Sequence, residues 1–149
     1  MKIFRQACVF LCFMLVCGTV FAGECKTYPG SKIEEKATEE ANKTLPGATA
    51  PRTTVYTSSD SFSAVVSFYR NVAREYVMPG QGKGEEKHLP SGEVLNEAYF
   101  IFDGSEDLMN SRFWAKVQRP YIGRIGAKGL ETTFEDVRDV TMIITVEKP

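Results

Sequence analysis

The sequence predicts an α+β fold, a single two-layer domain in which an antiparallel sheet of about four strands carries two helices on one face. Three observations support this prediction. Apolar residues recur at helical spacing in two segments of the N-terminal half. Apolar and polar residues alternate, as in strands, in the C-terminal half. Residues 23–149 have the length of one ordinary domain.

The first 22 residues have the organisation of a secretory signal peptide. Lys2 and Arg5 precede an apolar run from Ala7 to Val16, and Val20-Phe21-Ala22 resembles an export cleavage site. The run is shorter than the roughly 20 apolar residues that span a membrane. We therefore expect cleavage after Ala22, a periplasmic or secreted location, and no membrane span after cleavage. An uncleaved membrane anchor is the alternative.

Three of the four cysteines lie inside the leader, so the mature chain keeps only Cys25. A lipoprotein cysteine is poorly supported, because Val16 precedes Cys17 and Glu24 precedes Cys25. In an oxidising compartment a single thiol can pair with another chain or with a small thiol. Cys25 is therefore a candidate intermolecular thiol, and an unpaired cysteine without a role is an equal alternative.

The segment from Ser31 to Lys43 predicts a short amphipathic helix, because Ile33, Ala37 and Ala41 recur at four-residue spacing. Ser31 and the Glu34 three residues later match the capping-box pattern of a helix start.

A second, longer helix is predicted from Ser61 to about Tyr76. Its apolar residues recur at intervals of three and four, which places them on one side of a helix. Ser58-Ser59-Asp60 supplies capping side chains. Met78-Pro79-Gly80 ends the helix, and the segment through Gly92 is predicted to be an exposed connection.

Four segments predict strands: residues 52–56, 98–102, 112–118 and 141–146. In the third, Phe113, Ala115 and Val117 alternate with polar residues, so they are predicted to face the core while Trp114 faces solvent. Between the third and fourth strands, residues 120–129 are punctuated by glycine. Residues 131–136 are interpreted as a helical turn or a loop.

Three parts of the chain carry a resemblance: Tyr28-Pro-Gly-Ser-Lys, Thr57-Ser-Ser-Asp-Ser-Phe followed by Val65-Val-Ser-Phe-Tyr-Arg, and Arg119-Pro-Tyr-Ile-Gly. They resemble segments of an uncharacterised family of small exported bacterial proteins. The resemblance implies a bacterial periplasmic setting and a single α+β domain. It brings no catalytic residues to this chain.

The usual catalytic and cofactor motifs are not visible in the sequence. His88 is the only histidine, whereas a zinc or iron site needs three or four ligands, so we expect neither a metal site nor a cofactor. The glycine-rich segment 79–84 lacks the strand before it and the Lys-Ser/Thr helix after it that a phosphate-binding loop requires. Loss of Lys2 and Arg5 changes the formal net charge from −1 to −3, which argues against nucleic-acid binding.

The least ordinary stretch runs from Arg112 to Lys128, which contains five cations and no acidic residue. Strand alternation places Arg112, Trp114 and Lys116 on one face. An exposed indole between cations suits a sugar or aromatic ligand, an anionic polymer or a partner protein. Burial of Trp114 under a second layer is the favoured interpretation, because tryptophan is usually well buried. The candidate ligand or partner face consists of Arg112, Trp114, Lys116, Arg119 and Tyr121.

These observations favour an exported, non-enzymatic binding or accessory domain whose partner is a protein, an envelope component or a small ligand. One rival is an envelope-associated hydrolase that uses acidic residues such as Asp103 and Asp107. A second rival is a structural accessory protein linked to other chains through Cys25.

Overall fold

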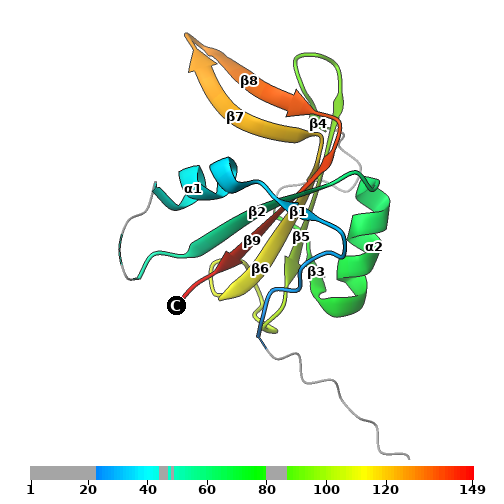
Figure 1. The fold of residues 1–149 in the computed structure, drawn as a ribbon, viewed down its shortest axis with the longest axis vertical. Helices are drawn as coiled ribbons and strands as arrows, with labels where there is room; N and C mark the ends of the chain where they lie inside the picture. The colour runs from blue at the N-terminus through cyan, green and yellow to red at the C-terminus, as the bar shows by residue number, and fades with distance from the viewer. Residues whose placement is uncertain (1–22, 44–46, 48, 80–86) are drawn as a thin grey trace, which may run out of the picture.

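The computed structural model describes residues 23–43, 47, 49–79 and 87–149, so the expected signal peptide lies outside the described residues. The fold is α+β, as predicted (Figure 1). Within the described residues the main sheet has seven antiparallel strands, not about four. They are β1 (Lys32–Ile33), β2 (Arg52–Ser58), β3 (Arg74–Tyr76), β4 (Lys87–His88), β5 (Val94–Ile101), β6 (Phe113–Arg119) and β9 (Thr141–Glu147).

The four strands expected from the sequence form the centre of this sheet. The strand order is β1-β2-β9-β6-β5-β3, and β4 also pairs with β5. The three additional strands have only two or three residues each and lie at the edges. Strands this short show no period-two pattern, which is why the sequence does not reveal them.

One face of the sheet is covered by helix α2 (Phe62–Val72). The helix begins where the Ser61 hydroxyl accepts a hydrogen bond from the Ala64 N–H. Its buried residues Val65, Val66 and Tyr69 pack on β5, β6 and β9, and this is the main core. The expectation that the helix continues to about Tyr76 is wrong, because residues 74–76 adopt an extended conformation and pair with β5 as strand β3.

Helix α1 (Glu35–Lys43) does not share that face; it lies along the edge of β2. Thr38 and Asn42, one turn apart, exchange hydrogen bonds with the backbone of Val55 and Thr53. Four helical residues rise about 6 Å, close to the span of two strand residues, so the two side chains match alternate strand positions. The helix therefore protects an edge that would otherwise be open to pairing.

The expected start of this helix at Ser31 is also wrong. Lys32 and Ile33 pair with β2 as β1, and the Ser31 hydroxyl donates to the Tyr28 carbonyl at 2.7 Å instead of capping a helix. Glu34 accepts hydrogen bonds from Thr57 and Arg138. Pairing with the sheet thus overrides the local capping signal.

The glycine-punctuated residues after Pro120 form a second, two-stranded sheet with residues 131–138, so the interpretation of 131–136 as a helical turn or a loop is wrong. The strands of this sheet are β7 (Tyr121–Lys128) and β8 (Glu131–Arg138). The Tyr121 N–H bonds to the Val140 carbonyl and joins the two ends of the hairpin at its base. The hairpin projects from the main sheet, with α1 on one side and β4 on the other (Figure 1).

Candidate functional site

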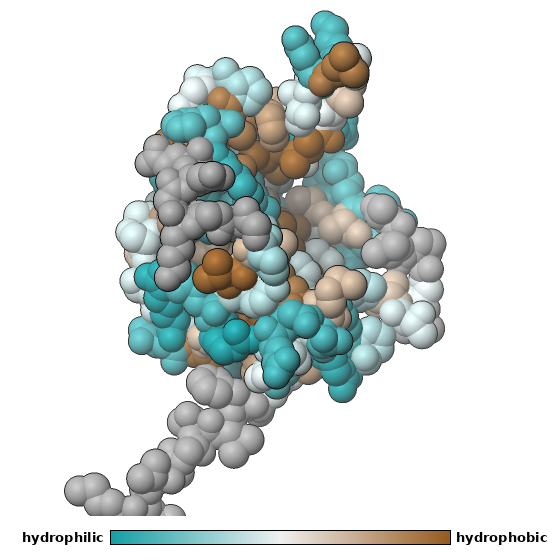
Figure 2. All heavy atoms as spheres, turned by 180° about the vertical axis from the view of Figure 1, so that it is seen from behind, coloured by the Kyte–Doolittle hydropathy of each residue, from teal (hydrophilic) through white to brown (hydrophobic). Residues whose placement is uncertain are grey.

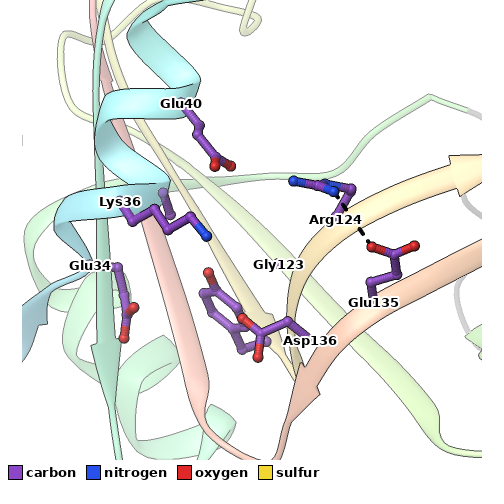
Figure 3. A pocket seen from close by; sticks show the side chains of 9 residues that line it. Glu34, Lys36, Glu40, Gly123, Arg124, Glu135 and Asp136 are labelled. Atoms are coloured by element: carbon purple, nitrogen blue, oxygen red, sulfur yellow. Dashed lines mark ion pairs between the residues drawn. The ribbon is translucent and has the colours of Figure 1, made fainter.

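A cleft of about 340 Å³ lies between α1 and the base of the β7–β8 hairpin (Figure 3). We call it the α1 cleft. One wall is the face of α1, and the other is formed by both strands of the hairpin. It is lined by Glu34, Lys36, Ala37, Glu40, Tyr121, Gly123, Arg124, Glu135 and Asp136.

Arg138 joins the two walls beside the cleft. Its guanidinium carbon lies 3.8 Å from the centroid of the Tyr121 ring. Its Nη1 atom donates to Glu34 Oε1 at 3.2 Å. The Arg138 guanidinium lowers the pKa of Glu34, and the same bond raises the pKa of Arg138. A cation held by both an aromatic face and a carboxylate is well fixed, so Arg138 sets the position of the hairpin against α1.

Asp136 has a strained backbone on the hairpin wall. Its φ of 51° lies in the left-handed region, where aspartate is among the few residues tolerated. Gly123 is adjacent, and a Cβ atom at that position would lie 2.7 Å from Asp136 Oδ2. Asp136 Oδ1 lies 3.3 Å from Arg138 Nε, close enough for an ion pair, although Nε is buried without a hydrogen bond. Strain of this kind concentrates at functional sites.

Charged side chains of both signs point into the cleft from its two walls. Figure 3 shows the Lys36 amino group and the Glu40 carboxylate directed from α1 toward the hairpin. Arg124 extends from the opposite wall, with its Nη1 atom 3.7 Å from Glu135 Oε2. All four side chains are exposed, so each can reorient to meet a ligand.

The five residues expected to form a ligand face do not lie together. Arg112 precedes β6, and its guanidinium carbon lies 5.7 Å from the centroid of the Phe113 ring. Arg119 binds Asp139, the Asp60 carbonyl and Thr141. Tyr121 is buried in the floor of the α1 cleft.

Trp114 and Lys116 do share the face of the sheet opposite α2, but that surface is partly buried. Lys116 pairs with Glu97 at 2.5 Å, and its Nζ lies 5.8 Å from the Tyr99 ring centroid. Glu97 also binds Lys87 at 2.7 Å, and the hydrogen bonds from both lysines outweigh burial and lower its pKa. Trp114 is half-buried, and its buried Nε1 atom has no acceptor in the described chain. Trp114 therefore lies on the face away from the main core, as alternation predicts, but it is partly covered there.

Asp103 and Asp107, the acids named for a hydrolase, organise the turn between β5 and β6. Asp103 accepts hydrogen bonds from the backbone N–H groups of Ser105, Arg112 and Phe113 and from the Ser111 hydroxyl. These bonds outweigh desolvation and lower the pKa of Asp103 to about 2. A carboxylate this acidic and this fully bonded is a poor general acid near neutral pH.

Cys25 lies over the strands β6 and β9. Its Sγ is 3.6 Å from the carbonyl oxygens of Trp114 and Val146. Burial, with a smaller effect of Glu147, raises the pKa of Cys25 to about 12. Because the thiolate is the reactive form, this environment favours a thiol that reacts slowly.

No family model, curated protein or solved structure matches this chain. In the described segments, no three His, Cys, Asp or Glu side chains gather in a way that could hold a metal ion. No helix among the same residues is long and apolar enough to cross a membrane.

The sequence contains only faint signals of the α1 cleft. Tyr121 is the one expected site residue that lines it. Gly123, Asp136 and Arg138 were missed because they belong to a hairpin without clear apolar alternation. Gly123 and Asp136 lie close together across the hairpin, but the sequence reveals them as neighbours only once the strand register is known.

Proposed function

We propose that this chain is an exported, non-enzymatic domain that binds a small polar ligand carrying both charges. The observation that carries the proposal is the α1 cleft. Its two walls, helix α1 and the β7–β8 hairpin, both present cations and carboxylates. Its volume of about 340 Å³ is near the lower end of the range for ligand pockets, which suits a small molecule.

The ligand class follows from the distribution of charge in the cleft. Lys36 and Arg124 supply donors for an anionic group. Glu40, Glu135 and Asp136 supply acceptors for an amine. A purely anionic ligand would be repelled by the carboxylates, and a purely cationic ligand would be repelled by the cations. A zwitterion such as a free amino acid complements both sets of charges.

The binding test uses matched forms of one amino acid. We expect calorimetry to show that free L-glutamine binds, while its methyl ester and its N-acetyl form, which each lack one charge, bind about tenfold less tightly. The variant Asp136→Asn keeps a residue that tolerates the left-handed backbone but removes the charge, and it is expected to weaken binding by about tenfold.

The control for Asp136→Asn is Glu39→Gln. Glu39 lies on α1 but pairs with Lys43 and does not line the cleft, so binding should stay unchanged. Equal affinity for the three glutamine forms would refute a zwitterion site. If a broader panel of amino acids and betaines also failed to bind, the proposal for the cleft would be wrong.

The export part of the proposal rests on the leader sequence and has a separate test. Native mass spectrometry of unreduced protein from the exported fraction of its own host should give the mass of residues 23–149 with a free thiol. A free thiol is expected because Cys25 is partly buried with a raised pKa. A disulfide-linked dimer would instead favour the accessory role through Cys25, and retention of residues 1–22 would favour a membrane anchor.

A further inference from the structure

The outer edge of β8 is unpaired in the described structure. Strand β8 pairs only with β7, and no hydrogen bond from other described residues reaches the backbone of residues 131–137. In the main sheet, α1 and β1 cover the outer edge of β2, and β3 and β4 cover that of β5. In the hairpin, β7 likewise pairs only with β8, but the groove described next lies beside β8. An exposed edge of this length is a template for adding another strand.

A groove of about 370 Å³ runs along this edge, separate from the α1 cleft. One wall is the turn between β4 and β5, and the other is β8. None of its lining residues belongs to β7, which places the groove on the open side of β8 and not across the hairpin face. It is lined by Leu89, Pro90, Ser91, Glu93, Glu131, Thr132, Thr133, Phe134 and Val137.

The groove is lined by apolar side chains and by two carboxylates. Leu89 is 4% exposed and, with Phe134 and Val137, gives a surface suited to one apolar side chain. Glu93 and Glu131 contribute the two carboxylates. Seen from behind, the molecule is hollowed beneath the hairpin, and hydrophobic residues gather there (Figure 2).

We propose that an extended peptide with alternating apolar and basic residues binds as a third strand on the outer edge of β8. Its backbone pairs with β8, one apolar side chain enters the groove, and basic side chains face Glu93 and Glu131. Main-chain pairing supplies affinity in this mode of recognition, and the groove supplies specificity. A two-stranded hairpin is marginally stable, so a third strand also orders it.

Charge favours such a peptide over a second copy of the chain. Strand β8 carries the acidic residues Glu131, Glu135 and Asp136 and the single cation Arg138. Pairing of β8 with β8 of another copy would therefore bring like charges together, which is unfavourable between adjacent strands. A basic strand meets no such repulsion.

The test uses the peptide acetyl-Lys-Val-Lys-Val-Lys-Val-amide, labelled for fluorescence anisotropy. Binding is expected to fall by about tenfold or more when alternate peptide nitrogens are methylated, because methylation removes the strand-pairing N–H groups. Hydrogen exchange should slow at the amides of residues 131–137 when the unmethylated peptide is present.

Two variants form a matched pair for this site. Phe134 and Ile125 are cross-strand partners on the hairpin, but only Phe134 lines the groove. We expect Phe134→Ala to weaken peptide binding by about fivefold or more and Ile125→Ala to change it less than about twofold. Circular dichroism would verify that both variants keep the fold.

Three results would overturn the proposal. The first is equal binding of the methylated peptide. The second is a lack of protection at residues 131–137, and the third is the absence of binding by lysine-alternating peptides carrying valine, leucine or phenylalanine. Slowed exchange in β8 that depends on protein concentration without peptide would show that a second copy is the occupant. This peptide proposal can fail independently of the zwitterion proposal. Asp136, whose substitution tests the zwitterion site, does not line this groove.

Discussion

Replacing Tyr69 with alanine is expected to lower the free energy of unfolding by about 4 kcal/mol, the cost typical of removing a large buried aromatic side chain. Tyr69 is 0% exposed and lies at the centre of the core. Its ring stacks on that of Phe100, with the ring centroids 5.4 Å apart. It also makes T-shaped contacts with the rings of Phe68 and Phe102. Because domains of this size have total stabilities of about 5–15 kcal/mol, the loss is a large fraction.

Chemical denaturation measures this effect, and two further variants separate its causes. Tyr69→Phe removes only the hydroxyl that donates to the Lys26 carbonyl at 3.0 Å, so we expect a loss of about 1 kcal/mol. Ser67→Ala, on the exposed side of the same helix, should be nearly neutral. A cost for Tyr69→Ala no larger than that for Tyr69→Phe would contradict the packing that we describe.

The second large effect is expected at Asp103. Asp103→Asn should reduce stability at pH 7 by about 1.5 kcal/mol, because an amide cannot accept all the bonds that the carboxylate accepts from the turn. This figure is at the lower end for charged hydrogen bonds, since solvent screens a carboxylate that is partly exposed.

The pH dependence of this contribution has a defined sign. The pKa of Asp103 is lowered in the folded protein, from 3.8 to about 2, so its stabilisation is complete above about pH 4. It is lost as the pH falls from about 4 to 2, where the folded carboxylate takes up its proton. Denaturation midpoints of the wild type and Asp103→Asn should therefore converge in this interval.

Asp107→Asn is the matched control for the acid experiment. Asp107 lies in the same turn, but its side chain is more exposed and accepts its closest hydrogen bonds from Asn110, so a smaller difference is expected. A wild-type curve that stays parallel to the Asp103→Asn curve down to pH 2 would show that Asp103 does not stabilise the turn as a carboxylate.

The elements with strong periodicity were predictable from the sequence, and the weak ones were not. The centres of β2, β5, β6 and β9 and the main helix α2 were located because their apolar residues repeat at strand or helix spacing. Strands β1, β3 and β4 are held by pairing with longer neighbours. Their own residues therefore contain too little pattern to identify them.

The hairpin shows a different kind of failure. Glycines 123 and 126 hide the strand pattern of β7, yet both face close side chains across the hairpin: Asp136 and Thr133 approach the positions where a Cβ atom would lie. A glycine that permits close approach and a glycine that permits a turn look identical in a sequence. The α1 cleft and the β8 groove both depend on this hairpin, so neither was predictable.

The sequence by itself determined the α+β class, the four central strands and the core helix, because each depends on local composition and periodicity. Only the tertiary structure decided that α1 protects a sheet edge, that Trp114 is half-buried, and that Arg138 joins Tyr121 to Glu34. These features depend on contacts between residues far apart in the chain. Their partners become neighbours only when strand order and register are established.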